Sequence, residues 1–390
     1  VLSWLPRIRQ ILLFLILLLS STQLGRHFWP SSSLVYGIRV DYLSPTLYLL
    51  DILIIGYLVI LPKTTLSKLN VEGVVLFLLT NLIFSINQIA TLAWSLHLLV
   101  YYLFVQSLSI NQIAILKLPL LIASTFQLIL SVSQLIMSHS LQGPLYYLGE
   151  RMVSVGQPGV ALTTFMDRVV LRAYGTFSHP NVLAGYLVIS LLIILKICKK
   201  TLAINWMLIV AILGVMLTQS HSSALALFGL IIPLYFLKNL RLRLLYFAAL
   251  LILAICYFSF LLPPRADLSI RERLSLQTLS LDLIKNYPIF GTGASASISI
   301  YPIRSPSHRL LQPDHNSFTL LLSWFGIVGV LVVVFFASQL YDFAALLLYI
   351  IPVLPLLILD HYLLTSPQGL LILLTYLKVV NYSHVKSRRQ

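Results

Sequence analysis

Arginine and histidine residues, which bind anions and move protons near neutral pH, concentrate in two polar segments of this chain. The segments are Ser138–Asn181 and Pro263–Asn316, and the sequence around them is almost entirely apolar. An Arg guanidinium grips phosphate or carboxylate through two parallel hydrogen bonds. The group of Arg residues therefore predicts an anionic substrate, although pairing with carboxylates or lipid headgroups is the simpler explanation for any one of them.

The first polar segment ends at the start of an apolar run. Pro180 suits the first turn of a helix, and Ser178 or His179 lies where a cap residue would be. We expect Arg172 and His179 to lie beside the positive end of that helix, where anions bind, although an ordinary helix start explains the same residues. Val160–Val170 is expected to form a short surface helix.

The second polar segment should contain an amphipathic helix at about 270–286 that ends before Pro288 and lies on the membrane plane. Gly291 and Gly293 follow and are expected to form tight turns or close packing. The segment then holds a further set of polar residues: Arg304, His308, Arg309, Asp314, His315 and Asn316.

The composition predicts an all-α, polytopic membrane helix bundle, because 59% of the 390 residues are hydrophobic and 9% are charged. We treat 1–390 as one membrane domain with external segments at 138–181 and 263–316. The first apolar run is expected to be a retained helix. About twelve transmembrane helices are predicted: Ile8–Leu24, Pro45–Leu61, Val71–Ile89, Leu92–Ser109, Leu118–Met137, Val182–Ile197, Leu202–Leu217, Ser223–Leu237, Leu244–Leu262, Ser317–Ala337, Phe343–Leu359 and Leu370–Val380.

The basic residues also predict the orientation of these helices. If both chain ends are cytoplasmic, the short inner loops hold nearly all the lysines, as the positive-inside rule requires. Both long polar segments then lie outside the cytoplasm. The net charge of +15 follows from this distribution and gives no reason to expect a nucleic-acid partner.

Several motifs resemble those of the O-antigen ligase/O-antigen polymerase family, over roughly Tyr146–Val334. Their order and spacing carry the likeness. The matching residues are Arg172, Gly175, Thr176, Phe177, Pro180 and Asn181, then Arg273, Pro288, Gly291 and Gly293, then His315 and Asn316, then Trp324, Gly326 and Gly329.

The resemblance implies a glycosyltransferase of the cytoplasmic (inner) membrane, with its active face on the extracytoplasmic side. Such enzymes transfer a glycan from an undecaprenyl-diphosphate carrier to a glycan, lipid A core or protein acceptor, with no metal and no cofactor. Ligase, polymerase and protein glycosylation activities all stay open.

One position departs from the family pattern. Members often carry Ser-Arg at the external end of a helix near the middle of the chain, where this sequence has Ser220-His221. His221 can donate a hydrogen bond to phosphate but is charged only part of the time near neutral pH. Either another Arg makes that contact or this chain handles its donor differently.

The expected roles follow from the chemistry of a diphosphate leaving group, which accumulates negative charge as the sugar–phosphate bond breaks. Arg172 and Arg273 are the first candidates to stabilise that charge, with Arg304 and Arg309 behind them. His315 is the candidate base for the acceptor hydroxyl, and Asn316 is expected to orient the loop or cap the next helix.

Three other readings remain open on the sequence alone. A transporter or flippase of lipid-linked oligosaccharide, or of another anionic substrate, would use ionisable residues inside the membrane, of which Asp51 is the clearest. A metal site could draw on His179, His221, His308, Asp314 and His315, although no metal-ligand spacing is present. A metal-dependent, oligosaccharyltransferase-like enzyme would have only Asp41 in the first external loop.

Overall fold

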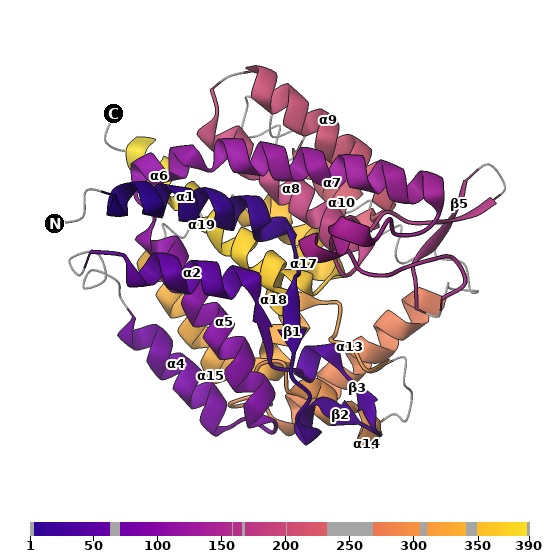
Figure 1. Cartoon of the computed structure of the whole chain (residues 1–390). Coiled ribbons are helices and arrows are strands. Elements are labelled where there is room, and N and C mark those ends of the chain that lie inside the picture. The colour runs from indigo at the N-terminus through magenta and orange to yellow at the C-terminus, as the bar shows by residue number, and fades with distance from the viewer. Residues whose placement is uncertain are drawn as a thin grey trace.

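The computed structural model describes residues 4–62, 71–157, 159–165, 168–199, 201–231, 268–304, 310–340 and 349–387. These residues form a helical bundle with three small β-hairpins (Figure 1). The longer helices are α1 (Leu5–Leu18), α2 (Leu49–Val59), α4 (Glu72–Ile83), α5 (Gln88–Ser107), α7 (Lys117–Met137), α8 (Pro180–Ile197), α9 (Thr201–Thr218), α13 (Leu268–Asn286), α15 (Ser317–Leu340) and α19 (Pro367–Ser387). The shorter helices are α6 (Ile110–Ile115), α10 (His221–Ala224), which continues as a π-helical turn over Leu225–Ile231, α14 (Tyr301–Arg304), α17 (Leu354–Leu359) and α18 (Tyr362–Thr365).

Helix α8 is the core of the bundle. It is apolar on all sides, and every residue from Pro180 to Ile194 is buried, as expected for a helix surrounded by other helices. Helices α7, α9, α10 and α19 pack around it. The helix begins as predicted: Pro180 takes its first position, and His179 caps it by accepting a hydrogen bond from the backbone N–H of Asn181.

Four of the described helical segments are long and apolar enough to cross a membrane: Gln88–Ser107, Ile110–Met137, Pro180–Ile197 and Ser317–Phe335. Leu49–Val59, Glu72–Ile83, Leu202–Thr218 and His221–Ile231 are apolar but shorter. The predicted span Leu244–Leu262 lies outside the described residues. The helical membrane class is therefore supported, and the number of twelve spans stays a prediction.

Two of the small sheets lie between α1 and α2, and the third lies in the polar segment Ser138–Asn181. Strand β1 (Gly25–His27) pairs with β4 (Thr46–Tyr48), β2 (Leu34–Val35) with β3 (Ile38–Arg39), and β5 (Leu162–Phe165) with β6 (Arg168–Leu171), all antiparallel. The expected helix at Val160–Val170 is wrong, because this stretch forms the β5–β6 pair. Its β-branched residues favour extended backbone over helix.

A glycine loop, Pro288–Ser295, ties α15 to the start of α5. The backbone N–H groups of Thr292 and Gly293 donate to carbonyls of α15, and the hydroxyl of Thr91 on α5 donates to the carbonyl of Ala294. Gly291 and Gly326 both have positive φ. Their backbones lie so close that a Cβ on Gly291 would clash with the backbone of Trp324, and a Cβ on Gly326 with the backbone of Ile289. The close packing expected at Gly291 is thus confirmed, and it is also confirmed at Gly293, where a Cβ would meet the side chain of Ser85.

Lys196 and Lys378 lie at one end of the bundle, and Arg172 and His179 lie at the other. His179 begins α8 and Lys196 lies in its last turn, so these residues mark opposite ends of one helix. Lys378 lies at the Lys196 end, where its ammonium donates to Gln106 near the end of α5. Arg172 lies at the His179 end, where it donates to Thr218 at the end of α9. In Figure 1 the first end is on the left, by α6, and the second is on the right, by β5 and α13.

Candidate functional site

A cavity of about 340 Å³ lies at the arginine–histidine end of the bundle. Its wall includes His179, His315, Asp360, His361 and Arg151, which come from four separate stretches of the chain. The volume is at the lower end of the range for small-molecule sites. A polar cavity built from distant segments is where binding or chemistry is expected in this fold.

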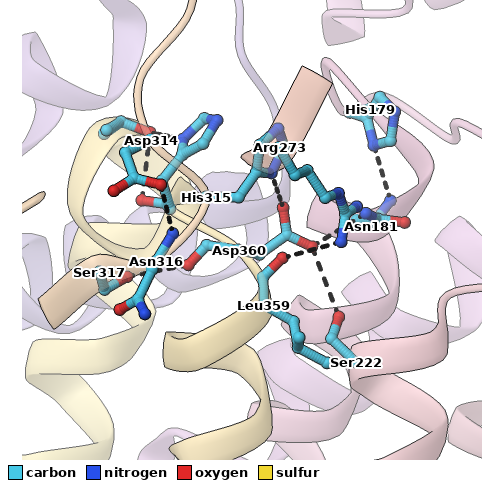
Figure 2. Close-up of polar contacts among 12 residues, drawn as sticks. His179, Asn181, Ser222, Arg273, Asp314, His315, Asn316, Ser317, Leu359 and Asp360 are labelled. Atoms are coloured by element: carbon cyan, nitrogen blue, oxygen red, sulfur yellow. Dashed lines mark hydrogen bonds and ion pairs between the residues drawn. The ribbon is translucent and has the colours of Figure 1, made fainter. Parts of the chain in front are cut away.

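Asp360 is the residue around which this part of the cavity is organised. It follows the last residue of α17 and is 5% exposed. Its carboxylate accepts hydrogen bonds from His315 Nδ1 at 3.3 Å, Asn181 Nδ2 at 2.9 Å and Ser222 Oγ at 3.4 Å (Figure 2). The carboxylate therefore joins the starts of α8, α10 and α15.

Arg172 enters this network through Asn181. Its Nη2 donates to Asn181 Oδ1 at 3.0 Å, while its Nε donates to the backbone carbonyl of Thr218 at 2.7 Å. Asn181 thus bridges the guanidinium of Arg172 and the carboxylate of Asp360. Arg172 holds the end of α9 against the start of α8, which fixes two elements of the site.

Arg273 comes from the amphipathic helix α13 and reaches the same place. Its Nη1 donates to the carbonyl of Leu359 at 3.2 Å, one residue before Asp360 (Figure 2). Arg172 reaches Asp360 through Asn181, Arg273 contacts the preceding residue, and His315 contacts Asp360 itself. The three residues that the sequence singled out for anion binding and base catalysis are therefore close together.

His315 lies just before α15, in a loop that is fixed on both sides. The carboxylate of Asp314 accepts hydrogen bonds from the hydroxyl of Thr319 and from the backbone N–H of Asn316. Asn316 accepts from the N–H of Phe318 and so caps the helix, one of the two roles expected for it. The His315 side chain is 18% exposed and borders the cavity.

The electrostatic environment favours an anion on the Asp360 carboxyl and neutral rings on two histidines. Burial raises the pKa of Asp360, but the hydrogen bond and charge of His315, with the charge of Arg273, outweigh it and hold the pKa at about 2. Burial, together with nearby cations, lowers the pKa of His179 to about 4 and that of His361 to about 3, although the Asp360 carboxylate acts to raise both. Arg172 and Arg273 are therefore the permanent positive charges of the cluster around Asp360.

The other predicted residues are placed less fully. His221 is exposed at the first position of α10, and it is its neighbour Ser222 that contacts Asp360. Arg304 ends α14, but only its backbone is described. Arg309 and His308 lie outside the described residues. Among the residues that the structure describes, no group of three or more His, Cys, Asp or Glu side chains is arranged to hold a metal ion.

Sequence reasoning missed Asp360 as a site residue. Asp51 is the acidic residue that the sequence singles out within an apolar run, whereas Asp360 lies at the same end of the bundle as the arginines and histidines. The signal was present, because a carboxylate that ends an apolar run needs a partner and the sequence places His361 and the external loops beside it. No spacing rule, however, pairs residues 315 and 360.

The comparisons bear on the same region. Residues 206–334 match the family model described as O-antigen ligase. A search of curated proteins found no match to this chain. The matched segment begins in α9 and contains Ser220-His221, α13, the glycine loop and His315, whereas Arg172, Asn181 and Asp360 lie outside it. Over these residues the chain is similar to the O-antigen ligase family.

Proposed function

We propose that this protein transfers a glycan from undecaprenyl diphosphate to an acceptor hydroxyl, with His315 as the general base. The observation that carries the proposal is the His315–Asp360 pair on the cavity wall, next to Arg273 and the Arg172–Asn181 bridge. A proton acceptor and anion-binding groups at one place are what this transfer requires. The family match supports the reaction class.

The Asp360 carboxylate fixes the tautomer of His315. With Nδ1–H donating to Asp360, Nε2 is the ring nitrogen that can accept a proton. The acceptor O–H transfers its proton to Nε2 as its oxygen attacks the anomeric carbon of the donor sugar. The bond from that carbon to the phosphate oxygen breaks, and its electron pair leaves on the diphosphate.

Arg273 and Arg172 would stabilise the charge that develops on the leaving diphosphate. Both guanidiniums are anchored to backbone carbonyls, so little reorganisation is needed when the charge appears. Neutral His179 and His361 leave the arginines as the main source of positive charge. No step in this scheme requires a metal ion.

The basic residues at the two ends of the bundle support the proposed membrane placement. Lysines occur at the end opposite the cavity, as expected for the cytoplasmic side. The cavity would then open at the outer face of the cytoplasmic membrane. The acceptor can be a lipid A core, a growing glycan or a protein, and the described residues favour none of them.

Reconstitution into liposomes with undecaprenyl-diphosphate glycan tests this function. We expect new glycosidic bonds when candidate acceptors are supplied, with the same yield in chelator. Counterflow of the intact lipid-linked glycan, without new bonds, would contradict the proposal and support a transporter instead.

A further inference from the structure

A second Asp–His pair borders the same cavity. His97 of α5 donates from Nε2 to the carboxylate of Asp51 at 3.1 Å and lies at the same distance from the carbonyl of Thr46. Its side chain is 20% exposed, and it lines the cavity together with Tyr48 and Trp94. The proposed reaction does not use this pair.

Asp51 is held as firmly as Asp360. It is 5% exposed at the start of an otherwise apolar helix, α2. Besides His97, it accepts hydrogen bonds from the hydroxyl of Tyr101 at 2.8 Å and the backbone N–H of Tyr48 at 2.8 Å. A carboxylate in such a place is costly, and it fixes the ring of His97 with Nε2 turned inward. Nδ1 is then the ring nitrogen available to a ligand.

The wall that continues from His97 is polar but carries little charge. Thr46 Oγ1 lies 2.9 Å from His27 Nδ1, and Ser44 Oγ lies 3.2 Å from the same nitrogen. His27 stacks on Trp29 with ring centroids 5.3 Å apart. We call His27, Ser44, Thr46, Tyr48 and His97 the hydroxyl wall; all five line the cavity.

Apart from Asp51, which lies behind His97, two charged groups that line the cavity near this wall form an ion pair. Arg151 pairs with Asp41 at 3.2 Å, and both line the cavity. The hydroxyl wall thus offers alternating donors, acceptors and ring edges without a net charge, unlike the arginine-rich surroundings of Asp360. Such a surface matches the hydroxyl groups and apolar ring face of an uncharged sugar better than a phosphate.

We propose that the hydroxyl wall is the subsite for the uncharged sugar ring attached to the diphosphate of the lipid donor. His97 contacts the sugar, and Asp51 is the positioning residue that orients it. This inference rests on the proposed function, because the diphosphate must lie at Arg273 for the attached sugar to reach the wall. It adds recognition of the first sugar to a site otherwise defined by the phosphates.

Two lipids test the proposal by binding, without any turnover. The probes are undecaprenyl diphosphate and undecaprenyl diphosphate linked to N-acetylglucosamine, each titrated against the detergent-solubilised full chain. We expect the sugar to tighten binding about tenfold, the effect of one or two hydrogen bonds. His97→Phe should remove that gain and leave the affinity for the bare diphosphate lipid unchanged. The exposed loop variant His139→Phe is the matched control and should keep the gain.

The outcomes separate the two ideas. If the wild-type protein does not bind the bare diphosphate lipid, the proposed function fails and the subsite fails with it. If the bare lipid binds but the sugar adds nothing, or His97→Phe keeps the gain, only the subsite is rejected. Thr46→Val, which removes one hydroxyl at nearly constant shape, guards against a misfolded His97 variant and should lose part of the gain. If both His97→Phe and Thr46→Val also lose affinity for the bare lipid, the hydroxyl wall has a structural role and the proposal is overturned.

Discussion

Two Asp–His pairs contribute a histidine to the cavity wall, and they have similar geometry and different neighbours. His315 and Asp360 are 45 residues apart in sequence, and Asp51 and His97 are 46 residues apart, so separation does not distinguish them. The first pair lies among the guanidiniums of Arg172 and Arg273, whereas the second lies among hydroxyls. The comparison teaches that the surroundings of an oriented imidazole decide whether it suits proton transfer beside an anion or recognition of an uncharged ligand.

Replacing the histidine of the first pair should separate the two regions most clearly. We expect His315→Ala to lower the turnover rate at saturating donor and acceptor by about 10²–10⁴-fold, because the acceptor proton loses its base. The measurement is the initial rate of glycan transfer in liposomes. His139→Ala, in an exposed loop away from the cavity, should retain the wild-type rate. An equal loss in both variants, or no loss in His315→Ala, would end the assignment.

The arginines near the first pair should determine the affinity for the diphosphate of the donor lipid. Arg273→Ala should weaken binding of bare undecaprenyl diphosphate by about 10–100-fold, the effect of losing a charge-assisted hydrogen bond. Arg271, two residues earlier on α13, is exposed, and its alanine variant is the matched control. Equilibrium titration checks both. Equal affinities in the two variants would mean that Arg273 serves only to hold Leu359.

Acid should weaken the region around Asp360. His179 and His361 have folded-state pKa values of about 4 and 3, below the ordinary value of 6.5, so the unfolded chain takes up protons first as the pH falls. Stability is then full above about pH 6.5 and declines toward about pH 4. Asp360, with its pKa near 2, keeps its contribution throughout that window.

Apparent Tm in detergent, measured between about pH 7.5 and 4.5, checks this expectation. The His179→Gln variant should show a smaller decrease than the wild-type protein, because one of the two buried rings no longer titrates in the unfolded chain. A decrease of the same size in both proteins would show that His179 does not contribute to it.

The smallest expected effect concerns the glycine loop that joins the two regions. Gly291→Ala should destabilise the protein by about 1–3 kcal/mol, because a left-handed backbone and a clash with Trp324 are combined there. Gly37→Ala is the control, since Gly37 also has positive φ but open space around it, and should cost about 1 kcal/mol. Similar values of Tm for the two variants would show that the close approach is not under constraint.

The sequence was sufficient for the elements that follow local rules. The apolar runs mark the helices, Pro180 and His179 mark the start of α8, and α13 covers the predicted helix at 270–286. The order and spacing of the family motifs also single out Arg172, Arg273 and His315, and the fold places these residues around Asp360.

What could not be predicted depends on the packing of distant segments. Asp51 and Asp360 are isolated acids in apolar sequence, and only the arrangement of the helices shows which histidine each one meets. The β5–β6 hairpin was mistaken for a helix because its short apolar pattern is compatible with both, and β-branching alone decided the outcome. Composition likewise does not predict which histidines line a cavity.

The close backbone contact of Gly291 with Gly326 determines where second-site suppressor mutations can arise. When two side chains clash, a smaller residue at either position relieves the clash, but glycine is already the smallest residue at both of these positions. A lesion at either glycine would therefore have no suppressor at the other. Compensating changes should arise instead where α4 and α5 meet this loop, by letting the whole loop move outward, which would also shift Ser295 in the cavity wall.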